Sequence, residues 1–192
     1  IRMVTGVQTC ALPISPAPRP SNTSLGTAFE HATLSFLTSP PLSLSLLHSG
    51  GSNDHGVDLR GWWESPADPG RERRKRWSVI VQCKAEKRRL GPRVVRELEG
   101  AVGYEEGKRR TIAMLVSSSG FSNEALLRAG ASKVPMSLVS LRREERGIVC
   151  EALTVNPVLR ELLGSALEVF RERRVEGGEE SMGIRWAGNE RG

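Results

Sequence analysis

The chain has 192 residues, of which 38% are hydrophobic, and it carries a formal net charge of +6 with an isoelectric point of about 9.8. These values suit one globular domain with polar tails, and the positive charge favours an anionic partner such as nucleic acid. Three cysteines without CxxC or histidine-rich spacing exclude a disulfide framework and a zinc site of the usual spacing, and no apolar run is long enough to cross a membrane.

The N-terminal residues stand apart from the rest of the chain. Residues 4–14, VTGVQTCALPI, resemble the conceptual translation of a sequencing-library adapter, so residues 1–15 are excluded from the fold prediction. The proline-rich stretch that follows favours disorder. We therefore expect residues 1–22 to lie outside the folded domain.

The next part of the chain predicts a helix followed by three strands. The sequence TAFEHATLSFL predicts a helix that Ser24 or Thr27 caps and that Pro40–Pro41 ends. Period-two alternation predicts a strand at 42–47, and a glycine-rich turn then separates it from later strands. Those later strands are expected at 57–63 and 77–84, with a basic loop at 64–76 between them.

Helices and strands alternate after the third strand. Pro92 begins a helix that is expected to run to Tyr104, and Ser122 is expected to cap a shorter helix. Apolar segments predict strands at 111–118, 135–141 and 148–155.

The C-terminal part is predicted to contain one more helix and a tail. Asn156–Pro157 begins the helix, which is expected to extend to about Arg173. The domain is thus expected to span 23–173, with a flexible tail at 174–192. The order of the elements predicts an α/β domain with a mixed sheet and helices on both faces.

The third predicted strand, VIVQCKAE at residues 79–86, ends with polar side chains. Residues two apart share one face of a strand, so Gln82 and Lys84 project side by side while Cys83 turns to the other face. Burying a lysine is costly unless a partner compensates its charge. The strand end therefore either emerges into water or carries chemistry.

A metal site is one explanation for these residues. If the second and third strands form an antiparallel pair, Asp58 lies beside the face of Gln82 and Lys84. Mg²⁺ prefers hard oxygen ligands, which Asp58, the Gln82 amide and the Cys83 backbone carbonyl would supply. Glu30 is a further candidate ligand, with a solvated helix face as its alternative. Lys84 would orient a water molecule or stabilise negative charge in the transition state.

The order of these residues resembles the Mrr-type branch of the restriction-endonuclease-like PD-(D/E)xK nucleases. The shared features are an Asp after a glycine-rich turn, a Gln-x-Lys strand end and a helix that contains Arg96-Glu97-Leu98. The similarity covers roughly residues 23–141 and extends more weakly to about residue 172. Within that branch, the chain is similar to the fungal mitochondrial family named for being required for respiratory growth.

The resemblance implies a restriction-endonuclease-like mixed sheet flanked by helices. It also implies a DNA endonuclease that uses Mg²⁺, with Mn²⁺ as an alternative, in a mitochondrial setting such as DNA maintenance. The catalytic residues that it implies are Asp58, Gln82, Lys84 and Glu30.

Basic runs lie on both sides of the third strand. Because they flank the motif, we expect them to contact the DNA backbone, with a strong dependence of binding on salt; a solvated basic surface is the alternative. The residues are Arg73, Arg74, Lys75, Arg76, Lys87, Arg88 and Arg89.

Other interpretations stay open at this point. A catalytically inactive nucleic-acid-binding or assembly protein on a nuclease fold is the second hypothesis, and a nuclease for RNA is a third. The sequence allows a homodimer. Cys83 is interpreted as a buried small residue, because no histidine is near it in sequence. The serine-rich turn at 117–120 could bind phosphate or act only as a turn.

Overall fold

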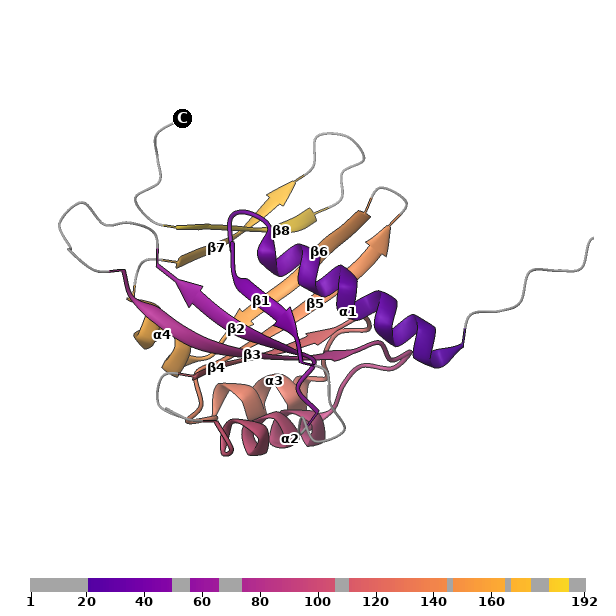
Figure 1. Ribbon diagram of the computed structural model, residues 1–192, viewed down its shortest axis with the longest axis horizontal. Coiled ribbons are helices and arrows are strands. Elements are labelled where there is room, and N and C mark those ends of the chain that lie inside the picture. Colours follow the sequence, from indigo (N-terminus) through magenta and orange to yellow (C-terminus); the bar gives the residue numbers. More distant parts are fainter. Residues whose placement is uncertain are drawn as a thin grey trace, which may run out of the picture.

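The computed structural model describes residues 21–49, 56–65, 74–105, 111–144, 147–164, 167–173 and 180–186. Their main feature is a six-stranded sheet in the order β1-β2-β3-β4-β5-β6, with helices on both faces (Figure 1). The α/β fold expected from the sequence is therefore confirmed. None of the described helices is long and apolar enough to span a membrane.

The helices are α1 (Asn22–Thr38), α2 (Pro92–Val102), α3 (Asn123–Gly130) and α4 (Pro157–Leu163). The strands are β1 (Ser45–His48), β2 (Leu59–Glu64), β3 (Arg76–Lys84), β4 (Thr111–Ser117), β5 (Met136–Glu144), β6 (Gly147–Val155), β7 (Leu167–Arg173) and β8 (Glu180–Trp186).

The sheet is mixed. Strand β3 pairs antiparallel with β2 and parallel with β4, and β4 is parallel to β5. The outer pairs, β1–β2 and β5–β6, are antiparallel. The three parallel strands therefore end at the same edge of the sheet, which is where Lys84 lies.

Alternation along β3 divides the apolar residues into two cores. Val79 and Val81 are buried in the core that also contains residues of α1 and α4. Ile80 points to the opposite face and packs in the core formed with α2 and α3. Because side chains alternate along a strand, Cys83 follows Val81 toward α1, and Gln82 and Lys84 follow Ile80.

The predicted helix caps are correct in part. Ser122 caps α3, since its side chain accepts a hydrogen bond from the Ala125 backbone N–H. The prediction for α1 is wrong, because the cap is Ser21, which lies before both Ser24 and Thr27. The helix begins within the proline-rich segment that the sequence prediction placed outside the domain.

The prediction that the last helix runs to Arg173 is wrong. Helix α4 ends at Leu163, and Gly164 follows with φ 68 and ψ −156, a backbone conformation that residues with a side chain rarely adopt. The next residues form β7, which pairs antiparallel with β8. Strand β8 lies in the segment that was expected to be a tail.

Candidate active site

The carboxylate of Asp58 is held against the end of β3 by backbone hydrogen bonds. The Asp58 N–H donates to the Val81 carbonyl at 2.9 Å, and the Cys83 N–H donates to Asp58 Oδ2 at 2.6 Å. Hydrogen bonds to an ionised acceptor are shorter and stronger than neutral ones. The antiparallel pairing of β2 with β3 thus brings Asp58 beside the Gln-x-Lys strand end, as the sequence predicted.

Gln82 carries a buried oxygen that has no hydrogen-bond partner among the residues that the structure describes. The residue is 5% exposed, and its Oε1 atom accepts no hydrogen bond within the described part of the chain. Leaving a buried acceptor unsatisfied costs about 1–3 kcal/mol, so native proteins rarely retain one without a reason. A cation or a hydrogen-bond donor bound to this oxygen would remove that free-energy cost.

Gly56 provides the space for the Gln82 side chain. Its φ is +76, and a Cβ atom built there would lie 2.9 Å from Gln82 Nε2. A side chain at position 56 would therefore strain the backbone and displace the amide. The sequence prediction treated this glycine mainly as a turn residue and missed its contact with Gln82.

The charges around the end of β3 affect the pKa of the Cys83 thiol. Burial raises its pKa from 9.0 to about 12, and the negative charges of Asp58 and Glu30 add to the increase. The Thr33 hydroxyl and the Lys84 ammonium group act in the opposite direction. The thiol is therefore protonated at neutral pH, which argues against a nucleophile, and the side chain is half-buried, so the prediction of a buried residue is correct only in part.

The candidate catalytic residues approach the strand end from two sides. Asp58 accepts a hydrogen bond from the Cys83 backbone, between Gln82 and Lys84, and Lys84 is half-buried on the same strand face as Gln82. Glu30 is half-buried on α1, which packs on the other face. Its charge acts on Cys83, so it lies near the cluster, but it approaches from the opposite side of the sheet.

These residues fit a hard divalent cation. Asp58 supplies a carboxylate, and Gln82 supplies an amide oxygen that has no other described partner. The N–H of Cys83 faces Asp58, and in a strand the carbonyl of a residue points to the same side as its N–H, so the Cys83 carbonyl is also available there. The described residues contain no group of three or more His, Cys, Asp or Glu side chains arranged for a metal. Such a site would depend on amide, carbonyl and water oxygens beside one carboxylate.

The basic segment after β3 is held in place by the serine turn. Ser118 Oγ donates to the Glu86 carbonyl at 3.2 Å, and Ser119 Oγ donates to the Arg88 carbonyl at 2.6 Å. These two hydroxyls are therefore engaged with backbone next to the site. The two hydroxyls support the segment that carries Lys87, Arg88 and Arg89, whose side chains are exposed.

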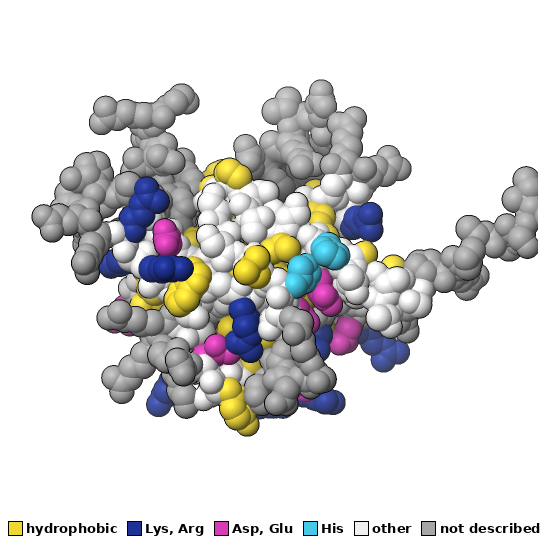
Figure 2. Space-filling model, viewed as in Figure 1, with side chains coloured by type: hydrophobic (Ala, Val, Ile, Leu, Met, Phe, Trp, Pro, Cys, Tyr) yellow, Lys and Arg dark blue, Asp and Glu magenta, His cyan; other side chains and the backbone are white. Residues whose placement is uncertain are grey.

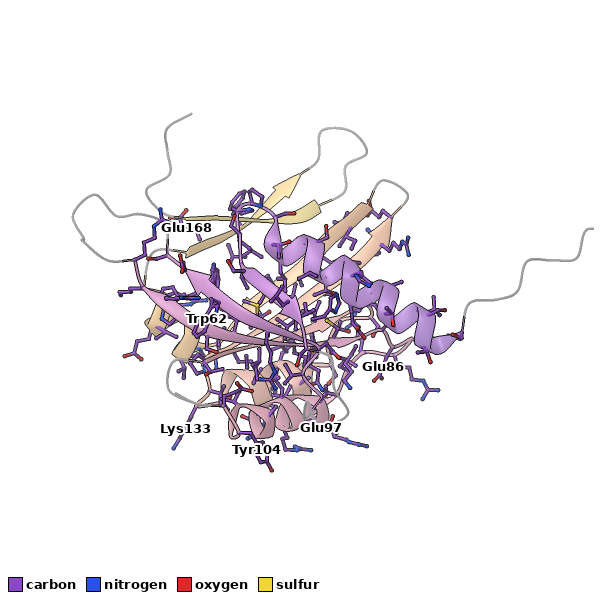
Figure 3. The ribbon with its side chains drawn as sticks, in the orientation of Figure 1. Trp62, Glu86, Glu97, Tyr104, Lys133 and Glu168 are labelled. Carbon is purple, nitrogen blue, oxygen red and sulfur yellow. The ribbon has the colours of Figure 1, made fainter. Side chains whose placement is uncertain are left out.

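The other basic run lies at the far end of β3. Strand β3 is nine residues long, so Arg76 and Lys84 at its two ends are about 26 Å apart. The Arg76 guanidinium stacks on Trp62 at 4.1 Å and pairs with Glu64 at 3.4 Å. Figure 3 shows Trp62 and Glu86 at opposite ends of the sheet. The structure therefore does not bring Arg74, Lys75 and Arg76 to the candidate site, and Arg73 lies outside the described residues.

A pair of histidines lies near the site, and sequence reasoning did not connect them. The rings of His31 and His48 have centroids 4.6 Å apart, and both are exposed on the face shown in Figure 2. The next residue, Ser49, donates its N–H to the Asp58 carbonyl at 2.8 Å. The pair forms because α1 crosses β1, and no local sequence signal reports that crossing.

Comparison with known proteins gives one family match and one curated relative. The family Mrr_cat, described as restriction endonuclease, matches residues 23–143. An uncharacterized mitochondrial protein of Schizosaccharomyces pombe is 35% identical over 125 residues, which cover 63% of this chain. The match spans only 46% of the length of that relative.

Two solved structures are also similar to this chain. The MspJI restriction endonuclease in complex with a 27-mer oligonucleotide has 17% identity and a TM-score of 0.39, covering 68% of this chain and 33% of that one. The DNA modification-dependent restriction endonuclease AspBHI has 15% identity and a TM-score of 0.40, covering 69% and 38%.

Proposed function

The chain belongs to the Mrr_cat family of restriction endonucleases, and we propose that it hydrolyses DNA phosphodiester bonds with Mg²⁺ or Mn²⁺ as its cofactor. The observation that carries this proposal is the buried Gln82 oxygen, which has no hydrogen-bond partner among the described residues, one residue before the backbone N–H that binds the Asp58 carboxylate. A nuclease with a metal at this point explains why an otherwise costly arrangement is present.

Three groups would hold the cation. They are the Asp58 carboxylate, the Gln82 amide oxygen and the Cys83 backbone carbonyl, with Glu30 as a further ligand through water. When bound, the cation supplies positive charge at the phosphate and a lower pKa for its bound water. The hydrogen bond from the Cys83 N–H keeps the Asp58 carboxylate oriented, so the protein does not have to reorganise when substrate binds.

Lys84 has a separate role in this proposal. It is half-buried and shares a strand face with Gln82. Its ammonium group would hold the attacking water or stabilise the additional charge on the phosphate during attack. Lys87, Arg88 and Arg89 would bind neighbouring phosphates, since the serine turn fixes their segment next to Lys84.

A plasmid-cleavage assay tests the proposal. The chain is incubated with supercoiled, linear and branched DNA in Mg²⁺, Mn²⁺ or EDTA, beside Asp58→Asn and Lys84→Ala. Lys133→Ala is the matched control, because Lys133 is exposed and precedes β5, at the opposite edge of the sheet (Figure 3).

We expect cleavage only with a divalent cation, at similar rates in the wild type and Lys133→Ala, and none with the two site variants. If no DNA is cut but DNA still binds with a steep salt dependence, a binding protein on a nuclease fold replaces the proposal. Cleavage of RNA in preference to DNA would contradict the assigned substrate.

We also propose a mitochondrial location and a homodimer. The location is supported by the description of the fission yeast relative as mitochondrial. Fractionation of cells that express the tagged full-length protein would test it, and absence from mitochondria would contradict it. Light scattering would test the dimer, which has twice the 21.0 kDa mass of one chain.

A further inference from the structure

A groove lies on the α1 face of the sheet, at the edge where β3 ends, between α1, the segment after β3 and strands β5 and β6. Its volume is about 790 Å³, which is within the usual range of ligand pockets. Phe29 on one wall precedes Glu30, and Ala85 on another follows Lys84. The groove therefore shares two chain segments with the proposed catalytic cluster.

Much of the groove surface is apolar. The residues that provide this surface include Leu25, Phe29 and Ala32 from α1, together with Leu141 and Ile148 from β5 and β6. Phe29 is half-buried, so part of its ring is accessible. Duplex DNA presents sugars and phosphates along its exterior, and such a surface gives little reason for an apolar wall. Bases that have left the stack present flat apolar faces that aromatic and aliphatic side chains bind.

Three cations that border the same groove form no ion pair with another residue that the structure describes. Lys87, Arg88 and Arg143 are exposed, and none forms a salt bridge with another described residue. A fourth cation, Arg142, is compensated by Glu144 at 3.0 Å and Glu151 at 2.7 Å. Among the described residues that line the groove, Glu86 is the one carboxylate. The border therefore has a net positive charge and complements an anionic chain.

We propose that this groove binds an unpaired DNA strand beside the scissile phosphate. The preferred substrate is then DNA with a single-stranded segment, such as an overhang, a gap or a flap. Single-strand binding requires apolar surface for bases and cations for phosphates, and this groove has both, with three cations that form no ion pair among the described residues. This inference rests on the proposed function, because it assigns the substrate class of that site.

Binding without metal tests the groove separately from catalysis. The complete chain in EDTA is titrated into fluorescein-labelled oligothymidine and into a blunt duplex of the same length, with anisotropy as the readout. Phe29→Leu removes the ring but keeps an apolar side chain, and Arg143→Ala removes one uncompensated cation. Lys133→Ala again controls for loss of one exposed positive charge, and thermal melting confirms that each variant is folded.

We expect Phe29→Leu to weaken single-strand binding about tenfold, as for the loss of one stacked base, and to change duplex binding less than about twofold. Arg143→Ala should lower the slope of log affinity against log salt for the single strand by about 0.7, with no such change in Lys133→Ala. Because Arg143 is exposed, this second variant keeps the test valid if Phe29→Leu folds poorly.

Three outcomes would overturn the groove assignment. In the first outcome, Phe29→Leu and Arg143→Ala both bind the single strand with wild-type affinity. In the second, these variants lose affinity for the single strand and for the duplex equally. The third is displacement of the single strand by an acidic peptide at lower concentration than by unlabelled oligothymidine, which would indicate a protein partner.

A cleavage assay in Mg²⁺ then compares the duplex with and without a single-stranded overhang. Faster cleavage of the overhang substrate, reduced by Phe29→Leu, supports the inference. If nothing is cut but the groove variants still lose single-strand binding selectively, the catalytic proposal fails and the groove assignment stands. If blunt duplex is cut as well as the overhang substrate, the function stands and the substrate class is wrong.

Discussion

The two ends of β3 are both rich in basic residues, but they use positive charge differently. At the N-terminal end, Arg76 stacks on Trp62 and pairs with Glu64, so its charge is compensated within the fold. At the C-terminal end, Lys87 and Arg88 form no salt bridge with any residue that the structure describes. A basic run in a sequence therefore indicates a ligand only after the local ion pairs have been identified.

The polar groups at the two ends of β3 also differ in how far neighbouring residues compensate them. The N-terminal end has exposed partners that stabilise one another weakly, by about 0.5–1 kcal/mol for a cation–π pair at an exposed site. The C-terminal end combines a carboxylate that accepts a hydrogen bond from the Cys83 backbone N–H, a buried amide oxygen without a described partner and a half-buried lysine. The buried oxygen and the half-buried charges at the C-terminal end are unfavourable without a ligand, and a bound cation and phosphate would compensate them. We therefore assign the active site to that end.

The largest expected difference between the two ends is catalytic. Lys84→Ala should lower the single-turnover cleavage rate about 10²–10³-fold, the usual effect of removing one group that stabilises transition-state charge. Arg76→Ala should leave the rate within about twofold, since Arg76 lies at the other end of the strand. Rapid-quench cleavage of one DNA substrate by both variants measures this. Equal losses would mean that the two ends do not have separate roles.

Replacing Gln82 should increase the stability of the metal-free protein and remove the stabilisation by Mg²⁺. Gln82→Met keeps a similar volume and removes the unpartnered oxygen, so we expect the free energy of unfolding in EDTA to rise by about 1 kcal/mol. The stabilisation that Mg²⁺ gives the wild type should be lost in this variant. Urea titrations with and without Mg²⁺ measure both effects. A variant less stable than the wild type in EDTA would show that the oxygen is satisfied in the native protein.

The two basic runs should differ in their salt dependence. Replacing Lys87, Arg88 and Arg89 by alanine should lower the slope of log affinity against log salt by about 2 to 3 for a duplex with an overhang. Replacing Arg74, Lys75 and Arg76 removes the same charge and should lower the slope by less than about 1. Anisotropy titrations at several salt concentrations compare the two triple variants. Equal slopes would favour a general basic surface over a localised one.

Cys83 should have the smallest effect on activity. Because its thiol is protonated at neutral pH, Cys83→Val should cleave DNA within about threefold of the wild type at pH 7. The pKa of the thiol is raised from 9.0 to about 12 in the folded state. Its contribution to stability is therefore fully present below pH 9 and is lost as the pH rises toward 12. The wild type should lose stability over that range more steeply than Cys83→Val, as measured by urea unfolding. A reactive thiolate at pH 7 would contradict this account.

The sequence was sufficient for the central strands because their signals are local. Alternation and apolar runs placed β2 and β3, and their antiparallel pairing then brought Asp58 beside Gln82 and Lys84. The β7–β8 hairpin was missed because its strands stabilise each other across a gap in sequence, while the residues after Pro157 have a helical pattern locally. Gly164 was the available signal for the helix end, and it was not used.

Other features of the site depend on contacts that no local pattern reports. Ser119 supports Arg88 from 31 residues away in the chain, so the function of the serine turn could not be decided from its sequence. The missing partner of Gln82 Oε1 is likewise a property of the packed structure. The sequence identified the candidate residues. Only the packed structure showed which of them have no hydrogen-bond or ion-pair partner among the described residues.

The most direct test of the assignment is a Mn²⁺ titration followed by electron paramagnetic resonance, with Arg76→Ala and Asp58→Asn beside the wild type. If the C-terminal end of β3 is the metal site, the wild type and Arg76→Ala should bind Mn²⁺ with the same affinity, and Asp58→Asn should lose that binding. Unchanged binding in Asp58→Asn, or no binding in the wild type with DNA present, would contradict the account.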